Sequence, residues 1–160
     1  MVFPPDLREV LAAALPTGPR WPNWREAVRD PAGSAAAYVR DGLAWPHDGM
    51  IFDIRNNAFW DPDWGQRPSS LDAAIELASR AVRAAPMLIP VYGHRYIPAE
   101  PCIAGNPVLS VYQMDIIVYG RDLAAYFVAE ASGRGESLVA DDRPIRCWTR
   151  WMVADWEELG

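Results

Sequence analysis

Apolar residues recur every three or four positions at the start of the chain, which is the spacing of one face of a helix. Pro5 stands in the first turn of this pattern and Pro16 ends it, as is typical of a helix bounded by prolines. Two shorter helices with polar N-caps are predicted next, over 21–30 and 34–43 with the caps Asn23 and Ser34.

From Gly49 onward the pattern changes from helical to extended. Two short β-rich runs flank Asn56 and Asn57, and paired asparagines favour a tight turn between strands. The sequence therefore predicts a β-hairpin over 50–60, followed by a loop over 61–68.

The most regular helical pattern lies over 69–86, with Ser69 or Ser70 as its N-cap. One apolar stripe runs along it, formed by Leu71, Ala74, Ile75, Ala78 and Val82. A helix with one apolar face of this kind is expected to pack flat on a sheet.

Two β-rich runs, over 87–97 and 107–119, are joined by a loop rich in proline and glycine, so we expect a wide hairpin connection. Helical spacing returns over 121–131, and a linker over 132–144 follows. The last helix is predicted over 145–158, with an apolar side formed by Ile145, Trp148, Trp151, Met152 and Trp156.

Strands in the middle of the chain with helices at both ends indicate an α+β fold. We expect one domain over 1–160, with a mostly antiparallel central sheet and helices packed on it. Its parts are a helical segment over 1–44, a core containing the sheet over 45–130, and a tryptophan-rich helix over 145–158.

The charge pattern restricts the class of partner. All fifteen basic residues are arginine, and twenty-one carboxylates give a net charge of −6. An acidic protein repels phosphate backbones, so we do not expect nucleic acid as a partner. The first residues lack a basic leader and no apolar run has the length of a membrane span, so we expect a cytoplasmic protein without membrane contact.

The stretch 91–101 gathers the polar and aromatic side chains of most interest. If it is one extended strand, Tyr92, His94 and Tyr96 share a face and Arg95 lies on the other. His94 is then a structural histidine bonded to a carboxylate such as Glu100 or Asp115, a contact to a ligand or partner, or a catalytic group.

Motifs for metal and nucleophilic chemistry do not fit the spacing of this chain. Pro101-Cys102 lacks the second cysteine of a zinc deaminase site, and Asp61-Pro62-Asp63 lacks the third acid of a calcium loop. Cys102 and Cys147 are isolated, so we interpret them as reduced thiols, although a Cys102–His94 pair across the loop is conceivable. We expect no metal and no cofactor.

The segment FWDPDWG places Trp60 and Trp64 on either side of Asp61 and Asp63 in an exposed loop. Most of the eight tryptophans are expected in the core, but these two are candidates for a binding surface. A pair of carboxylates also suits glycoside hydrolysis, although nothing in the sequence fixes their separation.

Longer segments resemble a known family. The runs WPHDGMIFDIRNNAFWDPDWGQRP, LIPVYGHRYIPAEP, GNPVLSVYQMDIIVYGRDLAAYF and IRCW are similar to members of the SMI1/KNR4-like (SUKH) superfamily. The resemblance implies an α+β fold with a central sheet. It also implies a bacterial immunity protein that binds and neutralises a polymorphic toxin, without a shared catalytic residue.

The leading hypothesis is a non-enzymatic binding protein whose acidic surface meets a basic toxin domain. The alternative is a small enzyme or small-molecule-binding domain with a pocket between the 91–101 and 60–64 segments. A third is an adaptor that docks through its C-terminal helix. The candidate binding residues are Trp60, Asp61, Asp63, Trp64, Tyr92, His94, Arg95, Tyr96, Glu100 and Asp115.

Overall fold

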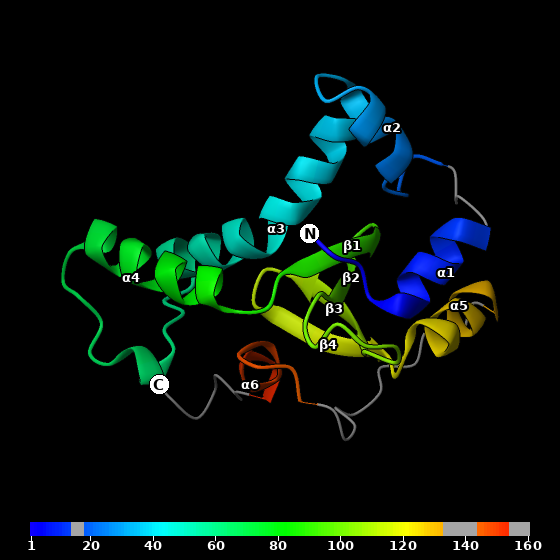
Figure 1. Cartoon of the computed structure of the whole chain (residues 1–160). Helices are drawn as coiled ribbons and strands as arrows, with labels where there is room; N and C mark the ends of the chain where they lie inside the picture. Colours follow the sequence, from blue (N-terminus) through cyan, green and yellow to red (C-terminus); the bar gives the residue numbers. More distant parts are fainter. Residues whose placement is uncertain (14–17, 133–143, 154–160) are drawn as a thin grey trace.

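The computed structural model describes residues 1–13, 18–132 and 144–153 (Figure 1). Within these ranges it contains helices and one four-stranded sheet, which confirms the predicted α+β fold. In chain order the elements are α1 (Pro5–Ala13), α2 (Trp24–Arg29), α3 (Ser34–Asn56), the 3₁₀ helix η1 (Pro62–Trp64), α4 (Leu71–Ala84), β1 (Leu88–Tyr92), β2 (Arg95–Pro98), β3 (Val108–Tyr112), β4 (Asp115–Gly120), α5 (Leu123–Ser132) and α6 (Trp148–Val153).

The sheet is an antiparallel meander in which each strand pairs with the next one in the chain. Each predicted β-rich run is in fact a tight hairpin of two strands. The first turns at Gly93 and His94, where Gly93 has a φ of +53° that glycine adopts readily. The second run turns at Gln113 and Met114. The wide connection expected between the two runs is present between β2 and β3.

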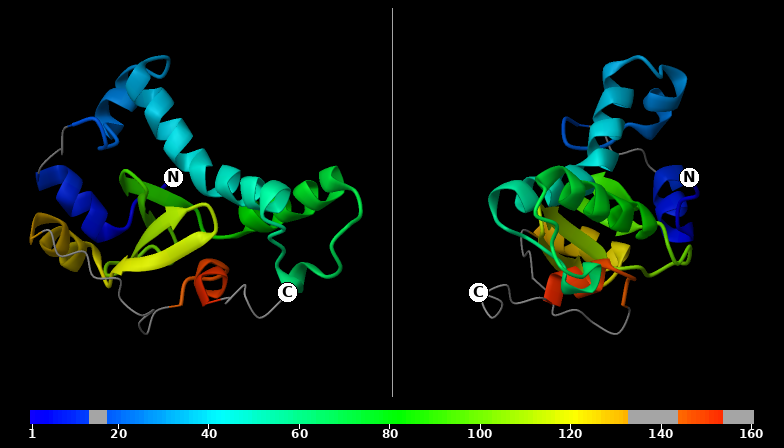
Figure 2. Two further views of the ribbon diagram at one scale, coloured as in Figure 1. Left: turned by 180° about the vertical axis from the view of Figure 1, so that it is seen from behind. Right: turned by 90° about the vertical axis from the view of Figure 1, so that its left-hand side faces the viewer.

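Helices cover both faces of the sheet (Figures 1 and 2). On one face α3, α4 and α6 bury a cluster of Met50, Ile54, Phe59, Ala74, Ala78, Leu88, Tyr96, Leu109, Val111, Met114, Ile116, Val118, Ile145, Trp148 and Trp151. On the other face α1 and α5 bury a cluster of Leu7, Ile89, Val91, Ile97, Val108, Leu123 and Tyr126. Strand side chains alternate between these two clusters, as the pleat of a sheet requires.

The predicted hairpin over 50–60 is wrong, because α3 continues through this region to Asn56. Glycine and asparagine have low helix propensity, so the local sequence favoured a turn. Tertiary contact overrides that preference at Gly49, where a Cβ atom would lie only 2.8 Å from the Cα atom of Gln113. The glycine lets α3 approach the turn between β3 and β4.

A proline inside α3 bends the helix visibly near its middle (Figure 1). Pro46 has no backbone N–H, so the carbonyl oxygen of Gly42 loses its partner within the helix. The hydroxyl of Tyr96 donates a hydrogen bond of 2.9 Å to this oxygen. The bend is therefore stabilised by a buried side chain of the sheet.

A buried carboxylate fastens the C-terminal part of α3. Asp53 accepts a hydrogen bond of 2.8 Å from the backbone N–H of Met114 and another from the side-chain amide of Asn57. The first bond joins α3 to the turn between β3 and β4, and the second holds the end of the helix. Hydrogen bonds to a charged group are among the stronger ones.

The remaining predicted elements differ in their details. The helices α1, α2, α4 and α5 are confirmed, with Asn23 and Ser70 as N-caps, but Gly33 caps α3 and Ser34 is its first helical residue. The α4 helix lies along α3 rather than flat on the sheet (Figure 2). The predicted boundary at residue 44 falls inside α3, whereas α6 begins only at Trp148. The linker from 133 and the tail from 154 lie outside the described residues.

The close contact at Gly49 makes a testable prediction. Gly49→Ala should lower the free energy of unfolding by about 1–3 kcal/mol, because the new methyl group meets backbone atoms that cannot move aside. Urea denaturation measures this change. Ala44 is exposed on the same helix, so Ala44→Gly is the control for helix propensity and should cost about 1 kcal/mol. If Gly49→Ala instead stabilised the protein, the close approach of α3 to the Gln113 backbone would not require glycine.

Candidate functional site

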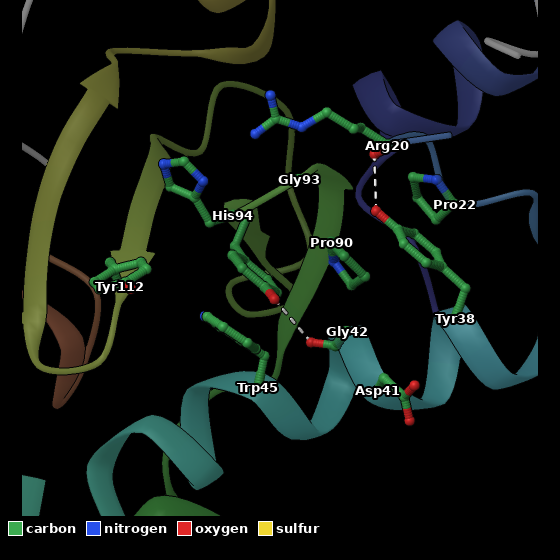
Figure 3. Close-up of a pocket in the computed structure, with 11 residues that line it drawn as sticks. Arg20, Pro22, Tyr38, Asp41, Gly42, Trp45, Pro90, Gly93, His94 and Tyr112 are labelled. Atoms are coloured by element: carbon green, nitrogen blue, oxygen red, sulfur yellow. Dashed lines mark hydrogen bonds between the residues drawn. The ribbon is translucent and has the colours of Figure 1, made fainter. Parts of the chain in front are cut away.

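A cleft of about 410 Å³ lies between the N-terminal half of α3 and the β1–β2 hairpin. Figure 3 shows the rings of Trp45 and Tyr112 on one side of it and Tyr38 on the other. Its lining residues are Arg20, Pro22, Tyr38, Asp41, Gly42, Trp45, Pro90, Gly93, His94, Tyr96 and Tyr112. The bend at Pro46 sets the direction of the helix that forms one side of this cleft.

Hydrogen bonds from the aromatic rings to backbone oxygens hold the cleft in shape. The indole N–H of Trp45 donates to the carbonyl of Val111 at 3.1 Å, and the hydroxyl of Tyr38 donates to that of Arg20 at 3.0 Å. The rings of Trp45 and Tyr112 lie 6.2 Å apart between centroids. The aromatic surface is therefore fixed before any ligand binds.

Three aromatic side chains along α3 are exposed to an unusual degree. Tyr38, Trp45 and Phe52 retain 37%, 43% and 47% exposure, and they stand seven residues apart. Asp41 and Asp48 lie between them and are also exposed. We call these five residues the α3 seam. Their spacing places them along one side of the helix, two turns per aromatic step.

His94 lines the cleft together with Tyr96, whereas the other candidate residues of the 91–101 stretch do not. The ring of His94 is half-buried and contacts Tyr112 edge to face, 6.4 Å between centroids. Because the chain turns at His94, Tyr92 and Tyr96 do not lie on one face with it. Among the described residues the ring has no hydrogen-bond partner, so the expected bond to Glu100 or Asp115 is absent.

The environment of His94 disfavours its charged form. Burial lowers the pKa of His94, the nearby Arg95 and Arg20 lower it further, and Glu130 opposes them. The imidazole is consequently neutral at neutral pH. A neutral ring without an internal partner is free to donate or accept a hydrogen bond at the mouth of the cleft.

Arg95 and Tyr92 turn toward the opposite face of the sheet. The guanidinium of Arg95 donates to Ser110 Oγ at 2.8 Å and lies 3.6 Å from the ring centre of Tyr119. The ring of Tyr92 packs against Trp21 at 4.7 Å. Both residues therefore stabilise the α5 side of the fold, and of the predicted 91–101 candidates only His94 and Tyr96 line the cleft.

Glu100 and Asp115 are exposed and lie outside the cleft. The loop after β2 is tied down by Asn106, whose side-chain amide donates to the carbonyls of Pro98 at 3.1 Å and Pro101 at 2.8 Å. Cys102 is a free, exposed thiol near the N-terminal segment, away from His94.

The 60–64 segment belongs to a separate structural cluster beside α6. Asp61 is buried and accepts hydrogen bonds of 2.7 Å from the indole N–H of Trp151 and 2.9 Å from the backbone of Asp63. Arg150 pairs with both aspartates, and the ring of Trp64 packs 6.1 Å from that of Trp151. The cleft beside His94 is lined by residues of α3 and by none of the 60–64 segment, so it is not the predicted pocket between the two segments.

Within the described ranges, no group of three or more histidine, cysteine, aspartate or glutamate side chains is arranged to hold a metal ion. The cleft residues that the sequence did not indicate are Arg20, Tyr38, Asp41, Trp45 and Tyr112. The seven-residue spacing of the seam aromatics is the signal that was available. This spacing indicates a shared side of a helix only if the helix continues past Pro46, and the predicted helix ended at residue 43.

The two aspartates near α6 should respond differently to substitution. Asp61→Ala should lower the free energy of unfolding by about 2–4 kcal/mol, because it leaves the buried Trp151 indole without its acceptor and removes one of the two partners of Arg150. The exposed Asp63→Ala is the matched control and should cost less than about 1 kcal/mol. Chemical denaturation measures both. Equal losses would contradict a structural role specific to Asp61.

His94 should make the fold sensitive to mild acid. Its pKa is lower in the folded protein than the ordinary value of about 6.5. Below that value the unfolded chain takes up a proton that the folded chain resists, so stability falls as the pH decreases. Urea unfolding between about pH 7.5 and pH 5 should therefore show a steeper loss for the wild type than for His94→Gln. Parallel curves would contradict the assignment.

Comparison with known proteins does not assign the chain to a family. The chain matches no family model, no curated protein and no solved structure. In the part of the chain that the structure describes, no helix has the length and apolar character required to cross a membrane.

Proposed function

We propose that this chain is a non-enzymatic binding protein that holds a protein partner in the cleft and along the α3 seam. The observation that supports this most directly is the exposure of Tyr38, Trp45 and Phe52 beside a preformed hollow. Contiguous exposed apolar side chains are typical of interaction surfaces. Tryptophan and tyrosine also provide much of the binding energy at protein interfaces.

The rigidity of this surface favours binding. Trp45 is held by its bond to Val111, and the Gly42 backbone beside it is held by Tyr96. Side chains that are already ordered lose little conformational entropy when a partner arrives. A surface of this kind suits tight association with one preferred partner.

The resemblance to SUKH proteins and the net charge of −6 indicate the class of partner. An immunity protein must reach its toxin quickly, and an acidic surface accelerates encounter with a basic protein. We therefore propose neutralisation of a basic toxin domain in the cytoplasm as the biological role.

A second candidate function is binding of a small molecule in the same cleft. Its volume of about 410 Å³ falls within the usual range of ligand pockets, which is roughly 300–1,000 Å³. The unpartnered ring of His94 offers one directional polar contact. Two features favour the protein partner instead: the aromatic surface continues beyond the cleft to Phe52, and Trp45 keeps 43% of its surface exposed.

Co-expression tests the proposed role. A toxin domain encoded beside this gene should kill its host, and the wild-type chain should restore growth. Trp45→Ala should weaken binding by about 2 kcal/mol, or roughly thirtyfold, and lower protection because it removes the central aromatic side chain. Val28→Ala, at an exposed apolar position on α2, is the control and should protect fully. Survival no better than with an empty vector contradicts the function, and full protection by Trp45→Ala contradicts the site.

A further inference from the structure

We propose that the cleft beside Trp45 holds an arginine side chain of the partner protein, with Asp41 as its counter-ion and the ring of Trp45 as its stacking surface. The inference deepens the proposed function, because that function supplies a partner and the seam supplies the chemistry that recognises it. The bound group is a single guanidinium, supplied by an arginine and placed at one end of the cleft.

The carboxylates of the seam are available for such a cation. Asp41 lines the cleft, and none of the described residues forms a hydrogen bond or ion pair with it. Asp48 interacts, among the described residues, only with the ring of its neighbour His47, at 3.2 Å, and keeps most of its side chain exposed. In the structural cluster beside α6, by contrast, Asp61 accepts hydrogen bonds from Arg150 and Trp151 of the protein itself.

The order of residues along the seam places each charge between two rings. Tyr38, Asp41 and Trp45 are three and four residues apart, and Trp45, Asp48 and Phe52 repeat that spacing. Residues so spaced are neighbours on a helix surface. A cation next to either aspartate therefore also meets aromatic surface, and a guanidinium gains from both ion pairing and cation–π attraction.

Among the described residues, this kind of contact already occurs three times. The guanidinium of Arg95 lies 3.6 Å from the ring centre of Tyr119, that of Arg20 lies 5.1 Å from the ring centre of Tyr92, and that of Arg67 lies 5.9 Å from the ring centre of Trp60. Arginine is favoured over lysine for such contacts because its planar group stacks on rings and is less strongly hydrated. A partner's arginine at Trp45 would extend a contact that this fold makes internally.

The hairpin end of the cleft restricts where the cation binds. Arg20 lies against Gly93 at this end, so a second cation there would be repelled. Figure 3 shows Arg20 near His94 at one end and Asp41 on α3 at the other. The cleft thus has a positive and a negative end. We place the guanidinium at the α3 end, and the partner's backbone carbonyls toward Arg20.

Peptide titration tests the inference without knowledge of the partner. The probes are Ac-Gly-Arg-Gly-NH2, its lysine analogue and its uncharged citrulline analogue. The readout is the ¹⁵N–¹H signal of the Trp45 indole, assigned with Trp45→Phe. We expect the arginine peptide to shift this signal at millimolar concentration and the citrulline peptide to bind at least about tenfold more weakly, because it lacks the charge. Equal affinity for citrulline or for lysine would overturn the proposal.

Matched charge variants locate the site. Asp41→Asn with Asp48→Asn should weaken the arginine peptide about tenfold, since both counter-ions are lost. The control is Glu9→Gln with Glu100→Gln, which removes two charges from exposed positions on α1 and in the loop after β2. A loss of affinity that is the same in both double variants would show attraction by net charge alone and would overturn the assignment of the seam.

The outcomes separate this inference from the proposed function. Arginine binding lost in Asp41→Asn/Asp48→Asn, together with no protection in co-expression, supports the site and contradicts the toxin-neutralising role. Full protection by the same double variant supports the role and contradicts the arginine site.

Discussion

The hydrogen bond from the Tyr96 hydroxyl to the Gly42 carbonyl is the contact on which the shape of this molecule depends. Pro46 leaves that carbonyl without a helical partner, and a buried carbonyl without a donor costs a substantial part of a hydrogen bond. Burial raises the pKa of Tyr96, so its hydroxyl keeps the proton that it donates. The bend is tolerated because the sheet supplies the missing donor.

The two halves of α3 then serve different purposes. The C-terminal half is held against the sheet by the close approach at Gly49 and by the Asp53 carboxylate. The N-terminal half diverges from the sheet after the bend and packs with α2 (Figure 1). The space left between this half and the β1–β2 hairpin is the cleft. Rigidity at one end of the helix thus makes an open, ordered surface possible at the other.

Local sequence predicts the parts of this fold whose signals are local. The helices α1, α4 and α5 and the central sheet follow from periodicity and from capping residues such as Ser70. The continuity of α3 does not, because Pro46, Gly49 and Asn56 each favour an ending, and the compensating contacts come from residues 54 to 64 positions away. Because the sequence predicted that the helix ends before Trp45, it did not predict the cleft either. His94 was chosen as a candidate on the assumption of one extended strand, whereas it lies in the tight turn between β1 and β2.

Asp61 and Asp41 show why charge and residue type alone do not identify a site. Each stands beside a tryptophan. Asp61 is buried and surrounded by donors from the chain itself, so its charge is used to close α6 over the core. Asp41 is exposed beside a hollow and has no such donor among the described residues, so its charge remains available. An acidic protein with many paired carboxylates presents a specific signal to a partner only where a carboxylate is unpaired and adjoins fixed apolar surface. Along the α3 seam both conditions are met.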